Sequence, residues 1–146
     1  MNNTAQFPGL LNECLVTQSR NAARRLTRLY NRQLTSVDLK SQQVSLLYFL
    51  YQRPLSSTAD LTDCLAIERS AVARNLAVLE TRELIQSDKK GRGLLRRYQL
   101  SPGGEVLLTS LSGAWHDAQR DVRDQVGEEG WVTIHKAFKL LSTLNI

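Results

Sequence analysis

The apolar positions in the first third of the chain repeat mainly at helical spacing. Residues 9–34 carry apolar side chains three or four positions apart, which predicts a first helix. A second helix is expected over residues 41–53, because Pro54 cannot continue it. The side chains that share one face of this second helix are Val44, Leu47, Tyr48 and Tyr51.

Two shorter helices are expected next. Ser56 or Ser57 can cap a helix that runs to about Leu65, because a serine hydroxyl accepts a hydrogen bond from the first turn. Another helix follows over residues 69–82. Its inward-facing stripe consists of Val72, Leu76 and Leu79.

The last third of the chain changes from strands back to helices. Residues 84–85 and 94–100 are expected to form two strands, joined by the basic, glycine-bearing turn Asp88–Gly93. Ser101 suits an N-cap and Pro102 the first helical position, so a long helix begins there. The glycines of 127–130 break this helix, and a last helix follows.

This order of elements predicts a single domain, residues 1–146, that is mainly α-helical with a small β-hairpin (α-α-α-α-β-β-α-α). Short helix, turn, second helix and basic hairpin over residues 36–100 make the layout of a winged helix-turn-helix, in which a helix enters the DNA major groove. The segments 9–34 and 101–146 are then dimerisation helices. Their apolar side chains are more numerous than a small domain can bury by itself, so a second copy is expected to cover them. These side chains are Leu11, Leu15, Leu111, Trp115, Trp131, Phe138 and Leu141.

The distribution of charge points to a polyanionic partner. The formal net charge is +5, yet residues 20–32 hold five arginines and no acidic residue, and residues 69–97 hold eight basic residues against three acidic ones. The rest of the chain is net acidic. Two concentrated basic segments on an acidic background favour nucleic acid over mere solubility.

The candidate DNA-binding side chains lie on the fourth helix and on the hairpin loop. If Val72, Leu76 and Leu79 face inward, the opposite face of that helix presents small residues, which allow close approach to the groove, and arginines, which can contact guanine or phosphate. The candidates are Arg69, Ser70, Ala73, Arg74 and Ala77 on the helix, and Lys89, Lys90 and Arg92 on the loop. The alternative is an ordinary solvated helix face and a merely soluble hairpin.

Four stretches of the chain, in the correct order, resemble the MarR family of bacterial regulators. They are RNAARRLTRLYNRQL (20–34), DLKSQQVSLLYFL (38–50), ERSAVARNLAVLETRELI (68–85) and LSPGGEVLL (100–108). The resemblance implies a triangular homodimer that binds a pseudo-palindromic operator in double-stranded DNA. It also implies a transcriptional regulator, expected to be a repressor, whose DNA binding is relieved by a small molecule or an oxidant.

The chain departs from the family pattern in two places. The family's wing carries an Asp-x-Arg pattern shortly before its closing strand, whereas here Asp88 lies too far upstream and Arg92 and Gly93 occupy that neighbourhood. The family also places glycine after the recognition helix, where left-handed geometry is needed, and here Glu83 stands at that position.

The remaining candidates concern the signal. Arg20, Arg24 and Arg28 recur at i, i+4, and the favoured interpretation is that they pair with the acids of 117–124. The alternatives are that they cross a dimer interface or anchor an anionic ligand, for which Arg20, Arg24 and Tyr30 are the candidates. Cys14 invites a redox role, because some relatives use a first-helix cysteine. Aligned through Tyr30, however, the sensing position falls nearer Val16, which favours a buried, inert thiol.

Other function classes find little support in the sequence. Cys14 and Cys64 stand at no metal-ligand spacing, and His116 and His135 lack a paired carboxylate, so no metal, cofactor or enzyme activity is expected. No signal peptide or membrane span is expected either, which favours a cytoplasmic protein. The rival hypothesis is a winged-helix scaffold that binds proteins and not DNA, although its recognition helix and wing would then need to lose their charge.

Overall fold

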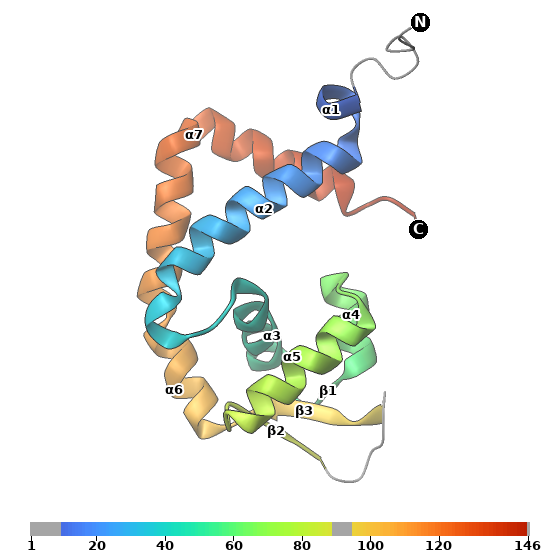
Figure 1. Cartoon of the computed structure of the whole chain (residues 1–146), viewed down its shortest axis with the longest axis vertical. Helices are drawn as coiled ribbons and strands as arrows, with labels where there is room; N and C mark the ends of the chain where they lie inside the picture. Colours follow the sequence, from blue (N-terminus) through green and yellow to red (C-terminus); the bar gives the residue numbers. More distant parts are fainter. Residues whose placement is uncertain (1–9, 89–94, 146) are drawn as a thin grey trace, which may run out of the picture.

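The computed structural model describes residues 10–88 and 95–145, with Leu10 and Leu11 described by their backbone only. It confirms a mainly helical chain with a small β part (Figure 1). The elements are α1 (Leu10–Glu13), α2 (Leu15–Gln33), the 3-10 helix η1 (Thr35–Val37), α3 (Ser41–Gln52), β1 (Ser56–Ser57), α4 (Thr58–Leu65), α5 (Arg69–Thr81), β2 (Ile85–Ser87), β3 (Arg97–Leu100), α6 (Pro102–Ser110) and α7 (Ser112–Leu141).

One hydrophobic core lies in the central body, which we define as residues 34–111. Leu46, Leu47 and Leu50 of α3 meet the buried stripe of α5, and their exposed fractions are at most 1%. Leu111 joins this core at 4% exposure, so it is not one of the exposed interface residues that the sequence suggested. Burial of these leucines is the main stabilising contribution to the body.

Only part of the expected face of α3 packs inward: Leu47 is buried and Val44 packs against the core, as the spacing indicated. Tyr48 and Tyr51 are 54% and 60% exposed, whereas Gln43, Leu46 and Leu50 point into the body. The expectation was wrong for the two tyrosines because α3 is apolar around most of its circumference. Periodicity alone therefore could not choose between the leucine face and the tyrosine face.

The small sheet closes one side of the body. Its strand order is β1-β3-β2, and both pairs are antiparallel, with Ser56 opposite Tyr98 and Ile85 opposite Leu100. The sequence predicted β2 and β3 but missed β1, whose two serines carry no apolar alternation. Ser57 does cap α4, as the sequence indicated, by accepting a hydrogen bond from the Asp60 amide.

The junctions after α5 follow the expected chemistry. Glu83 adopts a left-handed conformation, φ 56°, directly after α5, as the family position requires. The Leu84 amide donates to the Leu79 carbonyl oxygen, which closes the Schellman motif of this helix end. The Ser101 hydroxyl accepts from the Gly104 amide and donates to the Glu83 carbonyl oxygen, so it ties the start of α6 to the end of α5.

The first and last long helices lie side by side away from the central body and form what we call the arm, α2 and α7 (Figure 1). α2 has no buried residue, and α7 has only Ala118 and Val122. The expected single first helix is interrupted at Cys14. The expected long helix from Pro102 is interrupted at Leu111, and it then bends at Gly127, within the glycine stretch that the sequence identified as a break.

In the described part of the chain, no helix combines the length and apolar character that a bilayer crossing requires.

Candidate nucleic-acid interface

A short helix, a tight turn and a longer helix form the centre of the candidate interface. α4 begins with a capping box in which Ser57 and Asp60 satisfy each other's groups, and the hydrogen bonds from Ser57 lower the pKa of the Asp60 carboxyl. Ala66 ends α4 in a left-handed conformation, φ 50°. The chain then turns within three residues into α5, so the two helices are held by local geometry at a fixed mutual orientation.

α5 divides into a buried and an open face, as expected from its sequence. Val72, Leu76 and Leu79 are at most 1% exposed and hold the helix on the core. The residues proposed to contact DNA are all exposed on α5: Arg69, Ser70, Ala73, Arg74 and Ala77. No ion pair involves Arg69 or Arg74 within the described residues, so their charges are available to a partner.

The N-terminus of α5 is open to an anion. Glu68 occupies the N-cap position but makes no capping hydrogen bond with its side chain. The amides of Arg69 and Ser70 therefore point outward at the positive end of a 13-residue helix. Free amides at the positive end of a helix suit a phosphate oxygen, which is the anionic group of a duplex.

Two of the basic residues, Arg96 and Arg97, make structural contacts at the base of the hairpin. Arg96 pairs with Glu80 at 2.9 Å, and Arg97 donates to the Leu55 carbonyl oxygen at 3.0 Å. Asp88 closes the pair of strands through the Arg97 amide, so it does not act in an Asp-x-Arg wing. The loop candidates Lys89, Lys90 and Arg92 lie outside the described residues.

The candidate ligand residues are not brought together as a set. Arg20 and Arg24 are exposed on α2, whereas Tyr30 is half-buried, and this burial raises the pKa of its phenol. Tyr30 also projects from another side of α2, because six residues span about 1.7 helical turns. Arg20 and Arg24 instead share a helix face with Thr27 and Asn31, which are seven and eleven positions beyond Arg20.

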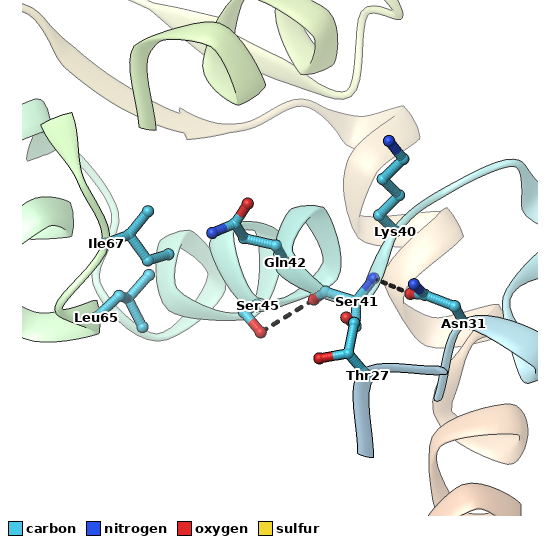
Figure 2. Close-up of a pocket in the computed structure, with 8 residues that line it drawn as sticks. All are labelled: Thr27, Asn31, Lys40, Ser41, Gln42, Ser45, Leu65 and Ile67. Atoms are coloured by element: carbon cyan, nitrogen blue, oxygen red, sulfur yellow. Dashed lines mark hydrogen bonds between the residues drawn. The ribbon is translucent and has the colours of Figure 1, made fainter. Parts of the chain in front are cut away.

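Thr27 and Asn31 line an open hollow of about 470 Å³ beside the start of α3. Figure 2 shows Leu65 and Ile67 at one end of this hollow and Lys40 at the other. The Asn31 side-chain oxygen accepts a hydrogen bond from the Ser41 amide at 2.7 Å, which joins α2 to α3 at the floor. The sequence did not predict this hollow, because its residues come from three separate parts of the chain.

Two further expectations about the arm are corrected. In the described residues the Arg20, Arg24 and Arg28 stripe makes no ion pair with the acids of 117–124; Asp117 pairs with Arg120 instead. Cys14 is also not the expected buried thiol. It is half-exposed at the N-terminus of α2, where a hydrogen bond with the Thr17 side chain lowers the pKa of its thiol.

Sequence reasoning missed two polar contacts that hold α5 in place. Asn75 bridges Gln42 and Gln43 of α3, and Arg82 donates to the carbonyl oxygens of Val37 and Asp38. Arg82 carried no recognisable signal, because its partners are backbone atoms, which every residue possesses. Asn75, Gln42 and Gln43 give at most a weak signal of their contact, because amide side chains are common on exposed helix faces.

Comparisons with known proteins agree with this geometry. Residues 37–97 match a family model described as the MarR family. No curated protein is significantly similar to the chain. Among solved structures, the chain is similar to the transcriptional regulator MosR of M. tuberculosis, with 25% identity, a TM-score of 0.79, and coverage of 90% of this chain and 95% of that one.

Two other structures extend the comparison. MosR in complex with DNA is 26% identical, with a TM-score of 0.75 and coverage of 88% and 93%. The regulator BpsR of Bordetella bronchiseptica is 18% identical, with a TM-score of 0.81 and coverage of 90% and 96%, which shows a shared fold. The family match covers α3, β1, α4, α5 and β2 and ends at the first residue of β3, whereas the similarity in fold covers 90% of the chain. The chain is therefore a DNA-binding transcription regulator whose residues 37–97 match the MarR family.

Proposed function

We propose that the chain binds a specific, pseudo-palindromic duplex site as a homodimer, represses transcription there, and releases the site when it meets a small-molecule or oxidant signal. The observation that carries the DNA-binding part is the outer face of α5. This face brings together Arg69 and Arg74, which form no ion pair with any residue of 10–88 or 95–145, and the small Ala73 and Ala77. The N-terminus of the helix also lacks a side-chain cap, and its buried stripe fixes it on the core.

Arg74 is the residue proposed to read a base. It lies in the second turn of α5, between two alanines that allow the helix close access to a groove, and a guanidinium can bind guanine through two hydrogen bonds. The loop residues Lys89, Lys90 and Arg92 are proposed to contact phosphates or the minor groove beside it. A helix that only covered the core would not need this arrangement.

The Arg74→Ala variant tests the assignment. We expect its affinity for the best duplex site to fall by about 10- to 100-fold, as removal of a guanidinium that binds one base through two hydrogen bonds implies. The matched control is Arg25→Ala, which removes an equal charge from exposed α2 and should bind as the parent does. Fluorescence anisotropy at physiological salt measures both. Parental affinity of Arg74→Ala for its best site would show that Arg74 has no such role, and absence of duplex binding by the parent would favour the scaffold hypothesis.

The exposed apolar residues of the arm support the homodimer. Leu15 is 68% exposed, Trp115 47% and Phe138 46%, and Leu141 lies on the same helix as the last two. An arm with only two buried residues in α7 and none in α2 leaves these side chains in water unless a second copy covers them. Two copies related by a two-fold axis would present two α5 helices to successive major grooves.

The hollow of Figure 2 supports a ligand signal, and an anionic molecule with an apolar body fits its chemistry. Leu65 and Ile67 can contact the apolar body, while Lys40 supplies positive charge. Arg24 does not line the hollow, but it precedes Thr27 by about one turn on the same face of α2 and can add a second charge there. Ile67 belongs to the turn that leads into α5, so a ligand pressed against it would disturb the first turn of that helix. Regulation of DNA binding by 6-hydroxynicotinic acid has been described for BpsR.

Benzoate and the isosteric neutral molecule benzamide test this part of the proposal. Benzoate should release the protein from DNA at lower concentration than benzamide, and Arg24→Gln should remove the difference while Arg25→Gln keeps it. Hydrogen peroxide with the parent and with Cys14→Ser tests the oxidant alternative. If benzoate and benzamide release the parent from DNA at the same concentration, the hollow does not select an anionic ligand. If peroxide releases the parent but not Cys14→Ser, the signal acts on the Cys14 thiol.

A further inference from the structure

The recognition helix α5 and the arm helix α2 share α3 as a packing partner and otherwise pack on different elements. α5 packs on α4, β2 and α3, whereas α2 packs on α7, α1, η1 and α3. The segment between the two helices in space is therefore residues 37–43, the end of η1 and the start of α3. A change in the angle between arm and central body can therefore reach α5 through this segment, beside the covalent connection from α7 through α6.

Arg82 fastens the C-terminal end of α5 to that segment. Its Nη1 donates to the Asp38 carbonyl oxygen at 2.6 Å and its Nη2 to the Val37 carbonyl oxygen at 3.0 Å. Both acceptors lie where the chain reverses, because Asp38 has a left-handed conformation, φ 50°. A planar guanidinium that holds two successive carbonyl groups fixes both distance and direction, which a single hydrogen bond does not.

The same segment is tied to the arm and to the middle of α5. Asn31 of α2 accepts the Ser41 amide at 2.7 Å, and Asn75 of α5 accepts from Gln43 at 3.3 Å. Gln43 is 8% exposed and also caps the start of α3 through the Lys40 amide. A chain of polar contacts therefore runs from α2 through residues 37–43 to two points on α5.

We propose that Arg82 is a positioning residue for DNA recognition, which sets the angle of α5 relative to the arm and thereby the spacing between half-sites that the protein accepts. The proposal rests on the homodimer and the pseudo-palindromic DNA site proposed above. Arg82 is suited to this role because it is exposed, so its loss leaves the hydrophobic core intact. It also lies at the far end of α5 from Arg69 and Ser70, the proposed contact residues.

The first test compares duplexes whose half-sites have the best spacing or one base pair more. In the parent, this extra base pair should reduce affinity strongly. In Arg82→Ala, the ratio of the affinity for the best-spaced duplex to the affinity for the longer duplex should fall at least threefold. Arg82→Lys should give an intermediate ratio, because one ammonium group cannot hold both carbonyl groups as the planar guanidinium does. Arg25→Ala should keep the parental ratio. A merely stabilising role would lower affinity for both duplexes equally, and that result would overturn the proposal.

The second test needs neither DNA nor a known site, so it separates failure of this proposal from failure of the proposed function. Spin labels at positions 23 and 77, in a chain whose Cys14 and Cys64 are serine, report the distance between α2 and α5; dilution with unlabelled protein isolates the distance within one chain. Arg82→Ala should broaden the distance distribution, whereas Arg25→Ala should leave it unchanged. An unchanged distribution in folded Arg82→Ala would overturn the proposal even if DNA binding is lost.

Discussion

Gly104 is the residue at which the join between α6 and the central body is tightest. A Cβ atom at this position would overlap the Leu84 carbonyl oxygen and lie 3.5 Å from Leu100 Cδ2. The obstacle is backbone that is itself held, since the Leu84 carbonyl oxygen accepts the Ser101 amide. The absence of a side chain at Gly104 therefore allows α6 to start directly against β2.

We expect Gly104→Ala to lower the free energy of unfolding by about 2–4 kcal/mol, because backbone must move to admit the methyl group. Its neighbour provides a matched control. A Cβ at Gly103 would have ordinary contacts of 3.7 Å and 3.8 Å, so Gly103→Ala should be neutral or slightly stabilising. Denaturant titration of both variants measures the difference, and equal stabilities would contradict the close approach that we describe.

Single residues with local signatures were predictable from the sequence. The cap at Ser101 and the left-handed Glu83 follow from short-range rules, which depend only on neighbouring residues. Tyr48 was misplaced because the choice between two apolar faces depends on the rest of the body. Arg82 was missed because its acceptors are carbonyl groups of a distant segment, and no residue type marks them.

At the scale of whole elements, α7 depends on one glycine for its bend. Gly127 has φ 71° and ψ 171°, a backbone conformation that residues other than glycine rarely adopt. Arg123 spans the bend through two 2.7 Å hydrogen bonds to Glu128 and lies over the Trp131 ring. The conformation of Gly127 and these contacts together set the direction of the last part of the arm (Figure 1).

Gly127→Ala should lower stability by about 1–3 kcal/mol, because alanine cannot easily hold this conformation. Gly113→Ala is the matched control on the same helix. It lies in regular helix with open space around it, so alanine there should raise stability by up to about 1 kcal/mol. Thermal unfolding by circular dichroism measures both shifts. A stabilised Gly127→Ala would mean that the bend is not a feature of the folded chain.

The wing is the element for which the sequence departs most from the family pattern that it resembles. We expect simultaneous replacement of Lys89, Lys90 and Arg92 by alanine to weaken binding to every duplex by about the same factor, because phosphate contacts are independent of sequence. The slope of log affinity against log salt should fall by about 0.9 for each phosphate that the variant no longer neutralises. Titrations over salt and sequence measure both. Unchanged affinity and slope would show that the wing does not touch DNA, and a changed sequence preference would indicate base reading by the wing.

For the whole molecule, the order of elements was predictable but the arrangement of the arm was not. Helical spacing located α3, α5 and the break at Gly127, since these patterns are local. Which apolar faces remain open is a property of the whole chain. Leu111 and Trp115 both lay on the expected interface, yet the first is buried in the core and the second is 47% exposed.

The proposed homodimer predicts a stable particle of twice the chain mass. Sedimentation equilibrium at micromolar concentration should show this mass for the parent. Phe138→Asp should shift the protein toward monomer, because a carboxylate in an apolar interface is not hydrated. The control Val106→Asp places the same charge on an α6 position that is already 73% exposed, and it should remain dimeric. A folded monomeric parent would contradict the dimer.

The central claim is that two copies of α5 read one two-fold symmetric DNA site. Selection of bound duplexes from a random library at physiological salt, followed by sequencing, tests this claim most directly. We predict an enriched inverted repeat whose half-sites are centred about 10–10.5 base pairs apart, or a multiple of that distance, and loss of one defined base preference in each half with Arg74→Ala. No enrichment over the starting library, or enrichment of a single unrepeated half-site, would contradict the account.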